Sequence, residues 1–160
     1  MEFSLIQFIA EYKSFGSKKV SYLGTTKFSD LRINKRKYLK RRKKTYLGSI
    51  LHFMRSIYSN SLKINKFGFI KNGMIVNPDI FIKNEFVKKI AHIKMKMDTL
   101  SIVYYNKKIN KQSKIIVESK EFIIDENGNY YSNPQIMFGG DMGSQKTCKM
   151  LPLNFSLTKE

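Results

Sequence analysis

The residues of this chain with the clearest capacity for chemistry form a dense basic run at positions 35–44. Eight of these ten positions hold a cation that can make charge-assisted hydrogen bonds to phosphate or carboxylate groups. One interpretation is a helix face that binds an anionic partner, and the other is a solvated face whose like charges are screened by water. Because like charges three or four residues apart destabilise a helix, we expect something to offset the run, such as the acidic residues of a neighbouring domain. Its members are Lys35, Arg36, Lys37, Lys40, Arg41, Arg42, Lys43 and Lys44.

The whole chain is strongly basic. It carries 30 Lys and Arg against 12 Asp and Glu, which gives a formal net charge of +18 in 160 residues. Such a field attracts nucleic acid, anionic lipid or an acidic polymer in a salt-dependent way. Only five of the thirty cations are Arg, and a lysine excess is also what an AT-rich genome produces at solvated positions. Since Arg is better suited than Lys to bind phosphates and bases, the charge alone does not separate function from compositional drift.

Side chains that could act in catalysis or metal binding are few and scattered. His52 lies inside an apolar segment and His92 lies among lysines, and neither has ligand-type neighbours at matching spacing. Cys148 is the single cysteine, and lysines on both sides of it could lower its pKa, but no histidine is near it in sequence. Ser49 follows a glycine without forming a G-x-S-x-G elbow. We therefore predict a non-enzymatic protein without metal or cofactor, in which His52 is a structural histidine.

The N-terminal half is predicted to contain a hairpin and a helical region, and the helical region carries the basic run and His52. Residues 3–13 and 18–28 are rich in strand formers, and the Ser14–Ser17 connection has turn chemistry, which predicts a β-hairpin. One long or bent helix is predicted over about 34–63, because apolar residues recur there at three- and four-residue spacing. Gly48-Ser49 interrupts this helix, either as a tolerated glycine or as a break in which Ser49 caps a second helix.

The remainder of the chain predicts antiparallel β-structure. Asn72-Gly73 lies between apolar runs and is a strong hairpin signal, and Thr99–Tyr105 is typical of a strand. Ile80–Ile82 and Phe86–Ile93 are ambiguous between strand and short helix. The glycines of 139–143 predict a turn, since no phosphate-loop ending or helix pattern follows them. The predicted fold is α+β, a single domain over 1–160 with a hairpin and one helix packed on an antiparallel sheet.

Two stretches resemble a known family. The segment YLGSILHFMRSIY at 46–58 is similar to the YLGS-x-x-HF-x-R-x-x-Y segment of bacterial carboxypeptidase-like regulatory domain proteins. The tail at 138–155, which contains LPLNF, is similar to the closing G…LLP-x-[DN]-[YF] of that family. Both occur in the family's order, and the likeness covers roughly residues 3–155. The motif residues expected to be structural are Tyr46, Gly48, Ser49, His52, Phe53, Arg55, Leu151 and Pro152.

The resemblance implies an exported envelope protein without catalytic residues. It covers only the portion downstream of the family's N-terminal β-sandwich, so we expect the downstream part of a longer ancestral protein. The expected partner is a missing N-terminal domain or an envelope protein, with anionic polymer, lipid or nucleic acid as further candidates for the basic run. The expected location is the periplasm or outer membrane, or the cytoplasm if Met1 is the true start, because the N-terminus lacks a signal-peptide pattern. The sequence does not indicate an oligomeric state.

Overall fold

The computed structural model describes residues 2–12, 18–29, 36–106, 109–145 and 150–157. The chain divides into two compact units, Met1–Arg36 and Lys37–Glu160. The prediction that residues 1–160 form a single domain stays a prediction, because the positions of these units relative to one another are not determined.

A long β-hairpin makes up the first unit. β1 (Glu2–Tyr12) pairs with β2 (Lys18–Lys27) in antiparallel register, as predicted from the strand formers in both segments. A register shift between Leu5 and Gln7 places a bulge in β1. The predicted N-terminal hairpin is confirmed, and its Ser14–Ser17 connection lies outside the described residues.

Two helices replace the predicted single helix. α1 (Arg36–Tyr46) and α2 (Ile50–Tyr58) are separated by Gly48, whose φ is +70°. Glycine adopts this conformation without the steric cost that a Cβ would bring, and it therefore ends helices. Ser49 caps α2, so a break with a capping serine is the correct one of the two alternatives, and one continuous helix over about 34–63 is not confirmed.

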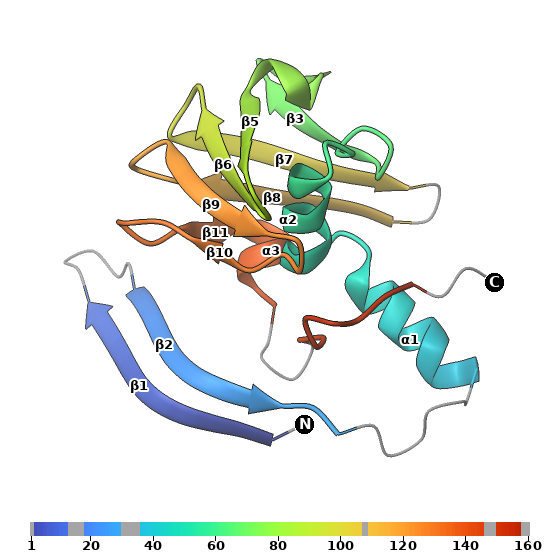
Figure 1. Cartoon of the computed structure of the whole chain (residues 1–160), viewed down its shortest axis with the longest axis vertical. Coiled ribbons are helices and arrows are strands. Elements are labelled where there is room, and N and C mark those ends of the chain that lie inside the picture. The colour runs from blue at the N-terminus through green and yellow to red at the C-terminus, as the bar shows by residue number, and fades with distance from the viewer. Residues whose placement is uncertain (1, 13–17, 30–35, 107–108, 146–149, 158–160) are drawn as a thin grey trace. The chain divides into compact units, whose positions relative to one another are not determined.

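The second unit contains two antiparallel sheets instead of the one predicted (Figure 1). The five-stranded sheet has the order β11-β8-β7-β3-β4, and the four-stranded sheet has the order β10-β9-β6-β5. The strand bounds are Phe67–Lys71 (β3), Met74–Val76 (β4), Ile82–Val87 (β5), Ile90–Met95 (β6), Thr99–Asn106 (β7), Ile109–Ile116 (β8), Glu121–Asp125 (β9), Tyr130–Tyr131 (β10) and Met137–Gly139 (β11). The chain is thus mainly antiparallel β with short helices, within the broad α+β expectation.

Short connections move the chain between the two sheets. The β3–β4 hairpin turns at Asn72-Gly73, where φ is 51° and 76°, so this predicted turn is confirmed. The 3₁₀ turn η1 (Pro78–Ile80) follows β4, and Pro78 at its start has no N–H with which to continue a ladder. The next strand then joins the other sheet, which explains why a single sheet does not form.

A third helix corrects another prediction. Residues 140–143 form the one-turn helix α3 (Gly140–Gly143), where the sequence predicted a turn. Met142 is buried, and its N–H donates to the Ser113 Oγ at 3.1 Å. The Asp141 carboxylate accepts from the Gln112 N–H at 2.8 Å. These contacts to β8 hold the turn of helix in place. The local sequence does not predict them, because their partners are about thirty residues away.

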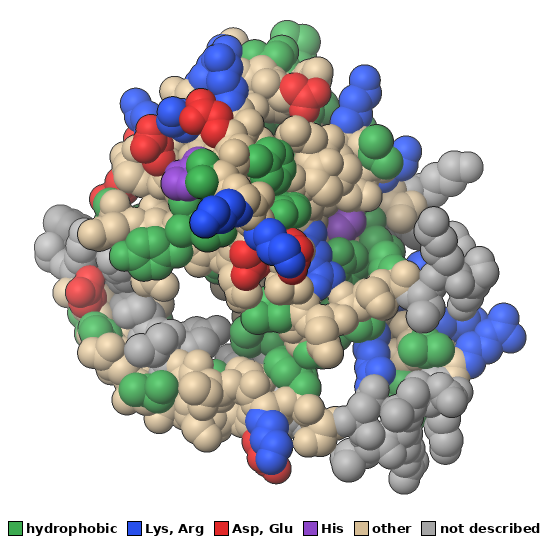
Figure 2. Space-filling model, viewed as in Figure 1, with side chains coloured by type: hydrophobic (Ala, Val, Ile, Leu, Met, Phe, Trp, Pro, Cys, Tyr) green, Lys and Arg blue, Asp and Glu red, His purple; other side chains and the backbone are tan. Residues whose placement is uncertain are grey.

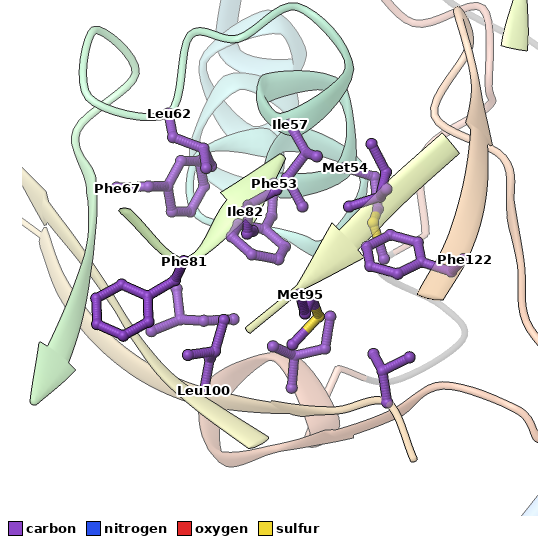
Figure 3. Close-up of a cluster of buried hydrophobic side chains, with 14 of the residues drawn as sticks. Phe53, Met54, Ile57, Leu62, Phe67, Phe81, Ile82, Met95, Leu100 and Phe122 are labelled. Carbon is purple, nitrogen blue, oxygen red and sulfur yellow. The ribbon is translucent and has the colours of Figure 1, made fainter. Parts of the chain in front are cut away.

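The core lies between the two sheets and is completed by α2 (Figure 3). Phe53, Met54 and Ile57 of α2 are almost fully buried, with exposed fractions of 0%, 0% and 1%. In Figure 3 they lie beside Ile82 and Phe122, which come from the four-stranded sheet. Burying each such side chain contributes roughly 1.5–3 kcal/mol. The predicted amphipathic character of residues 47–62 is therefore what fixes α2 on the β-structure.

Candidate functional site

The corner between α1 and α2 brings most of the motif residues together. α1 ends as the Leu47 N–H donates to the Lys43 carbonyl at 3.0 Å, and Gly48 then reverses the backbone. The Ser49 Oγ accepts from the His52 N–H at 3.1 Å, which satisfies one of the free donors at the start of α2. A Cβ on Gly48 would lie 2.8 Å from Tyr104 Cδ1, so the corner is packed as well as turned.

His52 is a buried part of this corner. Its side chain is 5% exposed, and its Nδ1 accepts from the Gly48 N–H at 3.2 Å. An accepting Nδ1 carries no proton, so the neutral ring is protonated on Nε2. Its ring centroid lies within van der Waals packing range of three aromatic rings, at 4.7 Å from Tyr46, 4.9 Å from Phe67 and 5.6 Å from Tyr104.

The surroundings of His52 oppose its protonation. Burial lowers the pKa of His52 from 6.5 to about 4, and the positive charges of Lys111 and Arg55 act in the same direction. The Lys111 ammonium donates to the Leu47 carbonyl at 2.7 Å, which holds that charge close to the corner. A neutral, enclosed ring with cations beside it is suited to structural support and not to proton transfer near neutral pH.

Arg55 joins α2 to two distant segments. Its Nε donates to the Asn127 carbonyl at 3.1 Å, in the turn between β9 and β10. One terminal nitrogen donates to the Phe155 carbonyl at 2.5 Å and the other to the Leu153 carbonyl. Its guanidinium also lies over the Tyr46 ring, 5.9 Å from the centroid. Each of the three guanidinium nitrogens thus donates to a backbone carbonyl of the fold.

The helix motif and the tail motif are in direct contact. The Phe155 ring lies 5.4 Å from the Tyr46 ring, and the Phe155 N–H donates to the Pro152 carbonyl at 2.9 Å to close a turn. Leu151 and Pro152 are half-buried. Phe53, the remaining motif residue, lies in the core against Phe67 and Phe69. The structure therefore brings together residues about a hundred positions apart. The sequence indicated only the order of the two motifs along the chain, not a contact between them.

α1 presents the basic run at the surface. Tyr46 is the buried residue of this helix, Arg42 is half-buried and makes an interaction, and Lys35 lies outside the described residues. Blue Lys and Arg side chains mark the helix at the lower right of Figure 2. None of the exposed cations is ion-paired within the described part of the chain; they are Arg36, Lys37, Lys40, Arg41, Lys43 and Lys44.

The other candidates for chemistry remain apart. His92 is on β6, exposed, and on a different sheet from the corner, and Cys148 lies outside the described residues. Across the described ranges, no group of three or more His, Cys, Asp or Glu side chains is arranged to hold a metal ion. Within the same ranges, no helix combines the length and apolar character needed to span a membrane.

Three further residues take part in the corner although no sequence pattern points to them. Tyr104 and Lys111 come from β7 and β8, and Asn127 comes from the β9–β10 turn. They act through a ring edge, a long ammonium side chain and a backbone carbonyl, so residue type gives no signal for them. Only the pairing of the strands brings them to α2.

No family model matches this chain, and no curated protein or solved structure matches it.

Proposed function

We propose that this chain is a non-enzymatic interaction protein of the cell envelope that binds a polyanionic partner through α1. The observation that carries the proposal is the set of six exposed cations on α1, unpaired within the described residues. Four of them recur at helical spacing and so share one face of the helix. These are Lys37, Lys40, Arg41 and Lys44.

The charges of α1 disfavour the helix when no anion is bound. Six pairs of cations lie three or four residues apart, and each costs roughly 0.2–0.5 kcal/mol, so the total is on the order of 1–3 kcal/mol. Arg36 and Lys37 also stand at the N-terminal end, where the helix dipole favours negative charge, and no acidic residue occupies the first turn. The pairs are Arg36–Lys40, Lys37–Arg41, Lys40–Lys44, Lys37–Lys40, Lys40–Lys43 and Arg41–Lys44. A polyanion along this face removes that cost, which adds to its affinity.

The use of the motif residues supports a non-enzymatic role. The side chains of His52 and Arg55 both bond to backbone groups of the fold. The resemblance to carboxypeptidase-like regulatory domain proteins supports an envelope location and a neighbouring domain or envelope protein as partner. On this proposal the chain contributes an anion-binding helix to that assembly.

A second candidate is binding of nucleic acid by the same helix. Arg36 and Arg41 favour it, because both are exposed and their forked donors suit phosphate groups. Duplex DNA or RNA and an anionic lipid surface are therefore compared in one experiment.

The experiment measures binding of the whole chain to acidic-lipid vesicles by pelleting, and to duplex DNA and RNA by fluorescence anisotropy. The test variant carries Lys37→Gln, Arg41→Gln and Lys44→Gln. The control carries Lys63→Gln, Lys96→Gln and Lys120→Gln, which remove the same charge from exposed positions on other segments. We expect the α1 variant to bind at least about tenfold more weakly. The slope of its log binding constant against log salt concentration is expected to be smaller in magnitude by about two to three, because three cations are removed. Equal losses in both variants would mean that net charge, not α1, governs binding.

A further inference from the structure

The outer face of the four-stranded sheet carries a second, chemically different surface. Along β6 the side chains alternate, with Ala91, Ile93 and Met95 buried and His92 and Lys94 exposed. The buried set packs in the core described above, so the exposed set belongs to a face that the core does not use. This face is separate from α1 and from the corner around His52.

Strand register aligns four side chains across this face. Glu85 on β5 is opposite His92 on β6, His92 is opposite Ile123 on β9, and Ile123 is opposite Tyr131 on β10. The row crosses three strand spacings, about 14 Å. In the neighbouring row Lys94 is opposite Glu121. Because register sets these pairs, the row is a fixed feature of the sheet.

The row lines a hollow of about 480 Å³ at the surface. The polypeptide after β10 closes one end of it with Ser132 and Asn133. Tyr131 stands at that end with 65% of its surface exposed. A smaller hollow of about 270 Å³ on the five-stranded sheet has no aromatic side chain in its lining. The larger hollow therefore combines an exposed ring with polar groups, which the smaller one does not.

The charges of the hollow select against an anion. Glu85 and Glu121 contribute two carboxylates, and Lys94 contributes one ammonium that lies 3.2 Å from the Glu85 carboxylate. In Figure 2 acidic side chains lie among basic ones over this sheet, although the chain as a whole carries a net charge of +18. A ligand here meets both acceptors and donors, and because carboxylates outnumber ammonium groups in the lining, it gains nothing from negative charge. A polyhydroxyl compound, whose hydroxyls both donate and accept, matches that lining.

We propose that this hollow binds a neutral oligosaccharide. One sugar ring stacks on Tyr131, since the apolar face of a pyranose packs on an aromatic ring, and further sugars follow the row toward Glu85. The side chains of His92, Lys94, Glu121 and Asn133 donate to or accept from the sugar hydroxyls. This site is independent of the anion-binding function proposed for α1.

The test is a titration of the isotope-labelled whole chain with cellotetraose, maltotetraose and chitotetraose, followed by NMR amide shifts. Binding near 1 mM is expected of an open polar hollow with one ring, so the sugars are added to about 10 mM. We expect at least one of them to shift the amides of Glu85, His92, Ile123 and Tyr131. The proposal is overturned if none of the three shifts these amides, or if a tetragalacturonate, the anionic analogue, binds there more tightly than all of them.

Variants then locate the contact. Tyr131→Ala is expected to weaken binding by about fivefold or more, because a stacked aromatic contact is lost. Tyr131→Phe keeps the ring and is expected to bind within about twofold of the unmodified chain. Tyr105→Ala removes another exposed tyrosine, on β7, and is expected to leave binding unchanged. Equal affinity of Tyr131→Ala and the unmodified chain refutes the proposal.

Discussion

The buried, neutral ring of His52 makes the second unit sensitive to acid. Its pKa is lowered from 6.5 to about 4, chiefly by burial and then by Lys111 and Arg55. Between these two values the unfolded chain binds a proton at His52 and the folded chain does not. Stability is therefore lost as the pH falls through this window, and it is fully retained above pH 6.5.

The size of the effect follows from the width of the window. Each pH unit between the two pKa values corresponds to about 1.4 kcal/mol, so the full shift amounts to about 3 kcal/mol. At about pH 5 the loss is about 2 kcal/mol, a large part of the stability of an ordinary domain. The structural event is protonation of Nδ1, which ends the hydrogen bond from Gly48 and places a cation near Lys111.

The assay is urea unfolding followed by circular dichroism at a series of pH values between neutral and about 4, with His52→Asn as the matched variant. The Asn Oδ1 can take the place of Nδ1 as the acceptor for the Gly48 N–H, but it does not titrate. The variant is expected to be less stable at neutral pH, because ring packing is lost. Other titrating groups affect both proteins alike, so the difference between their stabilities isolates His52.

The expected result is that this difference shrinks by about 2 kcal/mol between neutral pH and about pH 5. A difference that stays constant with pH contradicts the account of the corner. A direct NMR titration of the His52 ring gives an independent check, and a pKa of 6 or more in the folded chain would refute the burial argument.

Two further predictions concern the same corner. Arg55→Met is expected to lower the free energy of unfolding by about 2 kcal/mol. It should also speed hydrogen exchange at the Phe155 N–H, because the tail loses the bonds that Arg55 donates to its carbonyls. Arg55→Lys keeps the charge but not the forked donors, so it should recover less than half of the lost stability. Unchanged exchange in Arg55→Met would show that the tail is held by something else. Gly48→Ala is expected to cost about 2–4 kcal/mol, since a Cβ would be strained at φ +70° and would meet Tyr104 at 2.8 Å. Gly73 has a φ of +76°, and a Cβ there would meet open space. Gly73→Ala should therefore lower the free energy of unfolding by the backbone strain alone, about 1–2 kcal/mol. Equal costs at the two glycines, measured by urea unfolding, would rule out the packing argument at Gly48.

Much of the local structure could be predicted from the sequence. Asn72-Gly73 marks its hairpin because both residues tolerate positive φ, and Ser49 marks a helix start because its hydroxyl can accept from the backbone two or three residues on. The apolar spacing that predicts a buried helix face likewise holds over α2.

The long-range arrangement required the tertiary structure. The helix breaks at Gly48 because its φ is +70°, but the close approach of Tyr104, which a Cβ there would meet at 2.8 Å, comes from a distant strand and has no signal in the sequence. The cluster of carbonyls around Arg55 comes from Asn127, Leu153 and Phe155, and every residue type offers a carbonyl.

The same distinction separates the two proposed surfaces. The basic face of α1 can be read from residue types at helical spacing, since a helix places neighbours three and four apart on one side. The row from Glu85 to Tyr131 cannot, because it depends on the register of four strands that come from separate parts of the chain. Local hydrogen-bonding and steric preferences are fixed by short segments of sequence, whereas strand order and register are set by how the whole chain buries its apolar side chains.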